Sequence, residues 1–403
     1  MNTALKNYLR SPEMLLMLMA SAVPLSFATW SAMINNLSVE MAGFSGREIG
    51  ILQSIREIPG FLAFAVIFVL LLMREQTLAI VSLLLMGIGT ALTGYLPSVV
   101  GLYCTTLLMS FGFHYYEAVQ SSLSLQWIDK ERTALVLGRI LGVGSFTSLV
   151  AFGLIYAGLE LFSLSYRHVL LAGGGLTVVI TLVALLSYPA IASRHRQHKQ
   201  LILRRRYWLY YALVFFSGAR RQIFVVFAGF MMVEKFGYSA ANLTLLFLVN
   251  CAINIWLAPV VGRLVGRWGD RNALVFEYLG LIVIFTSYAF VSHAGLAAVL
   301  YILDHMFFAL AIAIKTYFQK IADPRDFASS AGVSFTINHV AAVLLPAALG
   351  LLWLSSPALV FLCGTGFAVC SLILSLMIPV NPAEGREFVL PAPMHSSRAR
   401  FPG

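Results

Sequence analysis

The sequence predicts an all-α polytopic membrane protein whose transmembrane helices form two six-helix bundles. Three observations predict it: the composition, the length of the apolar runs and one polar segment midway along the chain. Hydrophobic residues make up 60% of the 403 residues and charged residues 11%, with a mean hydropathy of +0.86. A soluble domain carries about 25% charged residues. The basic segment Ser193–Arg206 separates two long apolar blocks.

Helices fit this pattern better than a transmembrane β-barrel. A barrel needs segments of about ten residues with alternating polarity, whereas Phe61–Met73 is apolar without alternation. Lys6 and Arg10 precede the first apolar run, as in a signal peptide. That run is too long for a signal peptide and no small-residue cleavage site follows it. We therefore expect it to be the first spanning helix.

Twelve spans can be placed along the chain. Each apolar run is long enough to cross a hydrocarbon core of about 30 Å as a helix. The connections between runs are short and polar, as at Met73–Gln76 and Ser292–Gly295. The predicted spans cover residues 12–36, 48–72, 77–95, 98–124, 138–158, 168–190, 207–232, 240–262, 273–292, 297–319, 328–353 and 357–380.

Lysine and arginine residues set the predicted orientation, because cytoplasmic loops carry an excess of both. With both termini in the cytoplasm, the cytoplasmic segments hold 20 of the 27 basic residues and the opposite side holds three. The other four lie within spans. This asymmetry and contact with anionic lipid account for the net charge of +10, so no nucleic-acid partner is expected. Short loops and a compact length favour a bacterial cytoplasmic (inner) membrane.

An internal repeat supports two equivalent halves in parallel orientation. At an offset of 194 residues, Gly43–Ser45 matches Gly237–Ser239, and Asp129–Arg132 matches Asp323–Asp326. Gly138 matches Gly332 at the same offset. We expect residues 1–192 to form the N-terminal bundle, 193–206 a cytoplasmic linker, 207–380 the C-terminal bundle and 381–403 a disordered cytoplasmic tail.

Twelve spans, cytoplasmic termini and a six-plus-six repeat resemble the major facilitator superfamily of secondary transporters. After span 8 comes a loop similar to the signature loop of that family, which helps to close the cytoplasmic gate. Its residues are Gly262, Arg263, Arg267, Gly269, Asp270 and Arg271. Gly266 stands where the family usually has Asp, and Asp270 where it usually has Arg. The first-half copy is reduced to Met73–Gln76, and the antiporter glycine–proline motif in span 5 is missing.

Charged side chains within spans are the candidate functional residues, since burying a charge in a membrane is costly. They are Arg56 and Glu57 in span 2, His114 and Glu117 in span 4, Arg220 and Arg221 in span 7, Asp304, His305 and Lys315 in span 10, and Asn338 and His339 in span 11. In the fold that the resemblance implies, these spans surround a central cavity and spans 3, 6, 9 and 12 face lipid. Span 9 carries only Glu277, near its cytoplasmic end.

Helical spacing suggests how these residues are paired. His114 and Glu117 are three residues apart, so we expect them to interact on one face. Asp304 and Lys315 are three turns apart and share a face if the helix is continuous. Arg220 and Arg221 diverge by about 100° and cannot point the same way.

Each pair also has a purely structural interpretation. Arg56 and Glu57 could form ion pairs with neighbouring spans, and Asp304 could pair with Arg220 or Arg221. Lys315 fits a gate or lipid-headgroup residue. His339, beside Asn338, is more often a satisfied buried histidine than a ligand.

The leading functional hypothesis is a secondary transporter, symporter or antiporter, that works by alternating access. The sequence has no phosphate-binding G-x-x-x-x-G-K-[ST] loop, so an ion gradient or the gradient of the solute would supply the energy. Glu117 and Asp304 are the candidates for proton coupling. A surplus of one cation on the cavity helices favours an anionic or zwitterionic solute, with Arg220 as its clamp.

Three alternatives remain open. An exporter of drugs or other cations is one, since Trp30, Tyr115 and Tyr116 could bind a cation. A non-transporting assembly or delivery factor is another, given the reduced first gate loop. A metalloenzyme using His114, Glu117, Asp304 and His305 is disfavoured, because no metal-binding motif occurs. The four cysteines match no zinc or redox spacing. We expect no metal and no cofactor, and a monomer that contacts the solute and the lipid bilayer.

Overall fold

The computed structural model describes residues 11–128, 130–188, 191, 203–323 and 327–389, and this part of the chain is almost entirely helical. The first group of helices comprises α2 (Pro12–Asn36), α3 (Gly46–Phe61), α4 (Val66–Leu72), α5 (Glu75–Thr93), α6 (Val99–Trp127), α7 (Lys130–Glu160) and α8 (Tyr166–Ser187). The second group comprises α9 (Trp208–Gln222), α10 (Gly229–Glu234), α11 (Ala240–Phe290), α12 (Ala294–Phe308), α13 (Ile312–Ile321), α14 (Phe327–Ser355) and α15 (Pro357–Leu376).

Each predicted span coincides with one of these helices, with part of one, or with two or three consecutive elements. In the described residues, ten segments are long and apolar enough to cross a membrane. The other two predicted spans correspond to the broken helix α3–α4 and to α6. Spans 8 and 9 are the two parts of α11, which a backbone break at Gly269 separates.

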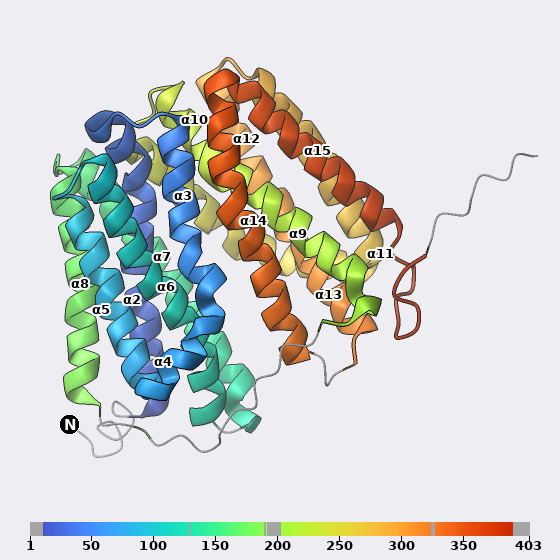
Figure 1. Cartoon of the computed structure of the whole chain (residues 1–403), viewed down its shortest axis with the longest axis horizontal. Coiled ribbons are helices and arrows are strands. Elements are labelled where there is room, and N and C mark those ends of the chain that lie inside the picture. Colours follow the sequence, from blue (N-terminus) through green and yellow to red (C-terminus); the bar gives the residue numbers. More distant parts are fainter. Residues whose placement is uncertain (1–10, 129, 189–190, 192–202, 324–326, 390–403) are drawn as a thin grey trace, which may run out of the picture.

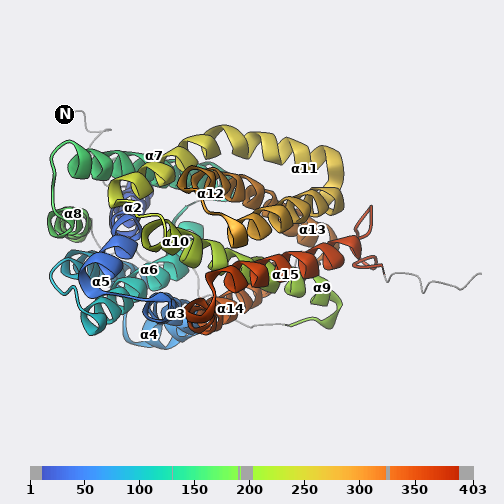
Figure 2. The ribbon, with the colours of Figure 1, turned by 90° about the horizontal axis from the view of Figure 1, so that it is seen from above.

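The two groups of helices lie on opposite sides of the molecule. Helices α2 and α5–α8 occupy one side in both ribbon views and α11–α15 the other (Figures 1 and 2). Helices α3 and α14 lie side by side where the groups meet, and α7 contacts α11. The exact bundle boundaries stay a prediction, and residues 193–202 of the expected linker lie outside the described residues.

The sequence repeat has a counterpart in the backbone. Gly43 and Gly237, which are 194 residues apart, have φ values of +63° and +66°, a left-handed conformation that glycine adopts without steric cost. Each is followed two residues later by a serine whose hydroxyl caps the next helix: Ser45 caps α3 and Ser239 caps α11. The same turn therefore leads into both helices. The second repeat pair lies partly outside the described residues.

Small residues let α3 and α14 approach closely. A Cβ atom on Gly50 would lie 2.3 Å from the carbonyl oxygen of Pro346, and one on Gly350 would lie 2.4 Å from that of Gly46. The hydroxyl of Ser54 accepts a hydrogen bond of 3.0 Å from the Ala347 amide. Such small-residue contacts are the usual way in which membrane helices pack tightly.

Residues 381–389 differ from the expected disordered tail. The Val389 amide donates to the Met377 carbonyl at 2.8 Å, and the Tyr317 hydroxyl donates to the Glu387 carbonyl. Arg206 forms an ion pair of 3.0 Å with Glu384. These contacts hold the segment against α13 and the start of the second group. Residues 390–403 of the expected tail lie outside the described residues.

Candidate functional site

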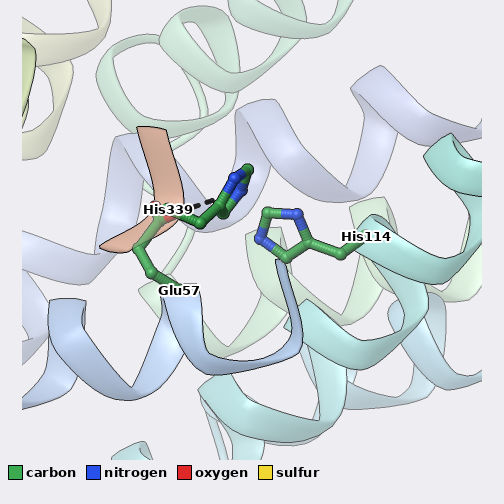
Figure 3. A group of neighbouring side chains, drawn as sticks. All are labelled: Glu57, His114 and His339. Carbon is green, nitrogen blue, oxygen red and sulfur yellow. Dashed lines mark ion pairs between the residues drawn. The ribbon is translucent and has the colours of Figure 1, made fainter. Parts of the chain in front are cut away.

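The first group of ionisable side chains lies where α3, α6 and α14 meet. Glu57, His114 and His339 are all buried and their side chains converge (Figure 3). One potential ligand atom from each lies within 4.8 Å of the others. Glu57 Oε2 is 3.6 Å from His339 Nε2, and the two imidazole rings meet edge to face with centroids 5.1 Å apart. An acid and a histidine from the first helix group thus face a histidine from the second.

Arg56 neutralises part of this group. Its Nε atom donates to Glu57 Oε1 at 3.0 Å, and its guanidinium lies over the Trp30 ring, 5.6 Å from the ring centroid. The Ser110 hydroxyl donates to the Arg56 carbonyl. Arg56 and Glu57 therefore pair with each other, and Glu57 also faces His339 of span 11.

A second group of ionisable side chains surrounds Arg221 of α9. The side chains of Arg221 and Glu117 are exposed, and the charge of Arg221 acts on Glu57, Glu117 and His305. His305 Nε2 is 2.7 Å from Asn254 Nδ2 of α11. His114 and Glu117 were expected to interact, but His114 is buried beside His339 whereas Glu117 is exposed near Arg221. The structure thus assigns these two residues to different groups.

The third group of ionisable side chains lies inside the second group of helices. Arg220 Nη2 is 3.3 Å from Glu277 Oε1, and both side chains are almost inaccessible. Arg220 also stacks over Tyr278 at 4.6 Å. Asp304 is buried, and its Oδ1 atom has no hydrogen-bond partner among the described residues. Arg220 forms its ion pair with Glu277, and its charge also acts on Asp304.

Glu277 is the main residue that sequence reasoning missed. It lies in span 9, which the resemblance places against lipid, but its side chain is 0% exposed. The available signal was its charge within an apolar run, together with two cations in span 7 that needed a partner. Arg220 and Arg221 do diverge as expected, since one is buried and the other exposed.

Three spans that carry these residues are interrupted immediately after them. The 3₁₀ segment Leu62–Ala65 follows α3, the π-helical segment Ile223–Ala228 follows α9, and the 3₁₀ segment Ala309–Ala311 follows α12. Such irregular turns often mark functional sites. The break after α12 also explains why Asp304 is buried and Lys315 exposed, because a 3₁₀ turn of about three residues rotates the following face out of register.

Asn338 contributes to helix packing. A Cβ atom on Gly218 would lie 2.3 Å from Asn338 Oδ1, so the amide occupies the space that the glycine leaves on α9. The structure places Asn338 between α14 and α9 and the adjacent His339 against α3 and α6.

The candidate gate loop folds around Asp270. Its carboxylate accepts from the Thr316 hydroxyl at 2.6 Å and from Lys320 Nζ at 2.7 Å. Gly269 has φ of +77° and ends the first part of α11.

Gly262, Gly266 and Asp270 line a pocket of about 280 Å³ against α13. Arg263 and Arg267 are exposed and Arg271 is half-buried. Lys320, not the predicted Lys315, is the lysine that contacts this loop.

A sequence model described as Major Facilitator Superfamily matches residues 14–346. The chain belongs to the Major Facilitator Superfamily. No curated protein matches the sequence.

Solved transporter structures share the superfamily fold at low identity. A mutant of the nucleoside transporter NupG has a TM-score of 0.75 and 15% identity, covering 91% of this chain and 99% of its own. A bacterial homologue of the human lysosomal transporter Spinster, in an inward-facing and unoccupied conformation, has a TM-score of 0.72 and 12% identity, covering 97% of this chain and 100% of its own. At these identities the similarity establishes the fold only.

Proposed function

We propose that this protein is a secondary transporter that moves a small solute by alternating access, its two helix bundles rocking around a site between them. The observation that carries the proposal is the meeting of ionisable residues from both helix groups. Glu57 of α3 faces His339 of α14 at 3.6 Å, and Arg221 of α9 acts on Glu57 and on Glu117 of α6. Charges inside a membrane protein are retained mainly where they bind or conduct.

The packing of α3 against α14 supports an inward-facing state. The close glycine contacts involve the start of α3 and the end of α14, which the predicted topology places on the outer side. At the opposite end of this contact, α4 and the start of α14 diverge (Figure 1). The solute site would then be reached from the cytoplasm. The Spinster homologue is itself described as inward-facing.

The solute that we propose is anionic or zwitterionic, with Arg221 as its primary contact. A guanidinium can hold a carboxylate or phosphate through two hydrogen bonds. Arg221 is exposed, whereas Arg220, the clamp favoured by the sequence, pairs with the buried Glu277. His305 and Asn254, which hydrogen bond at 2.7 Å, would supply neutral polar contacts nearby. Trp30 is buried against Arg56, and Tyr116 is buried as well. Burial therefore removes two of the three aromatic residues that a cation exporter could use.

Proton coupling would use carboxylates whose charge changes during the cycle. Glu117 is exposed near Arg221 and could exchange a proton with the solute path. Asp304 is buried with one carboxylate oxygen unpartnered among the described residues. We propose these two as coupling residues, with the solute gradient alone as the alternative source of energy. The transporter would work as a monomer in the cytoplasmic membrane, with both termini in the cytoplasm.

A ligand screen on the detergent-purified full-length protein tests the proposal. Thermal unfolding is followed with panels of anions, zwitterions and cations at about pH 5.5 and about pH 7.5, which bracket the titration of histidine. A ligand at 100 times its dissociation constant stabilises by about 2.7 kcal/mol. We expect an anion or zwitterion to stabilise the wild type, and Arg221→Ala to abolish the shift.

The matched control is Arg167→Ala, which removes an exposed arginine that stacks on Tyr95 away from the three groups. This variant should keep the ligand response. Stabilisation by a cation alone, lost in Glu117→Gln, would contradict the predicted sign of the solute. A complete lack of response would contradict transport of these classes and favour a non-transporting assembly or delivery role.

A further inference from the structure

The cluster of Glu57, His114 and His339 has the composition of a transition-metal site. Two imidazoles and one carboxylate from three different helices place potential ligand atoms within 4.8 Å of one another, and all three side chains are buried (Figure 3). Zinc bonds of about 2.0–2.2 Å need closer ligand atoms. Movements of about 1 Å in each side chain would bring them into range.

The ring of His339 is already oriented as a metal-binding histidine. Its Nδ1 atom is 2.8 Å from the Phe335 carbonyl oxygen, four residues earlier on α14. Because a carbonyl oxygen can only accept, this contact places the proton on Nδ1 and leaves the Nε2 lone pair facing Glu57, 3.6 Å away. Metal-ligating histidines almost always donate their other ring N–H in this way.

His114 brings to the cluster a ring nitrogen that is available as a metal ligand. Its Nδ1 atom is buried and has no hydrogen-bond partner among the described residues. A buried polar atom without a partner is unfavourable, so a metal ion bound by the ring of His114 would relieve an existing penalty.

Gly60 provides the space in which the two imidazoles meet. A Cβ atom at this position would lie 2.2 Å from Cδ2 of His339 and 2.9 Å from Cε1 of His114. Both rings therefore occupy the space that the missing side chain of Gly60 leaves, one helical turn after Glu57 on α3.

Arg56 determines which class of ion the cluster could accept. It occupies Glu57 Oε1 and adds a positive charge, so the single free carboxylate oxygen is a poor ligand set for Mg²⁺ or Ca²⁺, which need several oxygens. Imidazole nitrogen suits Zn²⁺, Cu²⁺, Ni²⁺ and Co²⁺. We propose that Glu57, His114 and His339 bind one such transition-metal ion, with the fourth position open to water or an anion.

Binding would join the two helix groups. Glu57 and His114 belong to α3 and α6, and His339 belongs to α14. An ion held by all three would fix α14 against α3 and α6. If the protein is the transporter proposed above, the bound ion would therefore inhibit the alternation of states.

The test uses the full-length protein in detergent, freed of metal and titrated with Co²⁺ and Zn²⁺ in the absence of any solute. We expect one ion per chain, visible as the d–d absorption of cobalt and displaced by zinc. His114→Ala and His339→Ala should each weaken binding by at least about tenfold. His168→Gln, which alters an exposed histidine at the start of α8, is the matched control and should bind like the wild type.

Replacing one metal-ligating residue by another keeps the test decisive if an alanine variant does not fold. His339→Cys should retain cobalt and add a sulfur-to-cobalt charge-transfer band, which a merely structural role for His339 would not produce. Failure of the wild type to bind either ion, or equal affinity in the wild type and His114→Ala, would overturn the proposal. Because no solute is present, this result is independent of the ligand screen that tests transport.

Discussion

At the scale of residues, the buried charges of this protein differ in how completely they are paired. Arg56 shares its carboxylate partner with His339, and Arg220 uses one of its nitrogens on Glu277. Arg220 Nε and Nη1 and Glu277 Oε2 have no hydrogen-bond partner among the described residues. Because desolvating an ion is costly, such a pair adds little net stability while intact, yet breaking it leaves a bare buried charge.

Removal of Glu277 should therefore destabilise the protein strongly. We expect Glu277→Leu to lower the free energy of unfolding by about 3–5 kcal/mol, measured by SDS titration in mixed micelles. The double variant Arg220→Met with Glu277→Leu should recover most of this loss, because it removes both charges. Glu160→Leu, at an exposed position on α7, should change stability by about 0.5 kcal/mol or less. Equal losses in the single and double variants would show that the two charges are not coupled.

At the scale of elements, breaks in the helices position the functional side chains. Two 3₁₀ segments and a π-helical segment follow Glu57, Arg221 and His305 within five residues. The break within α11 is made differently, by Gly269 with φ +77° and ψ +162°. That conformation is essentially restricted to glycine, and it directs the next residue, Asp270, toward Thr316 and Lys320.

Two glycines of the gate loop should respond oppositely to alanine. Gly269→Ala should cost about 1–3 kcal/mol because of its backbone conformation. Gly266→Ala lies in helical backbone, and a Cβ atom there meets nothing within 4 Å. It should be neutral or stabilising by up to about 1 kcal/mol. Unfolding of both variants under the same conditions checks this difference, and a loss at Gly266 as large as that at Gly269 would contradict it.

At the scale of the whole molecule, the distribution of basic residues predicts the orientation in the membrane. The two helix groups meet along α3 and α14, and the proposed inward-facing state depends on which end of this contact faces the cytoplasm. Arg74 precedes α5 and His293 precedes α12. The two residues lie in exposed connections that the prediction assigns to opposite sides, so they can report the orientation directly.

Cysteine labelling in cells should distinguish the two sides. In a background with the four native cysteines replaced by alanine, His293→Cys should react with a membrane-impermeant maleimide in intact cells. Arg74→Cys should react only after permeabilisation, because the side rich in lysine and arginine stays in the cytoplasm. The reverse pattern would invert the topology and turn the inward-facing interpretation into an outward-facing one.

The sequence by itself determined the helical membrane class, the position of the spans and the equivalence of the two halves, because apolar length and turn-forming glycines are local properties. It also identified the charged residues that need partners. The partners themselves were decided by tertiary structure. Glu277 joins Arg220 across 57 positions, His339 reaches Glu57 across the contact of two helix groups, and Lys320 replaces Lys315 at the gate loop. Helical spacing cannot specify such pairs, because helix breaks change the register of the faces and the packing of separate helices determines which faces meet.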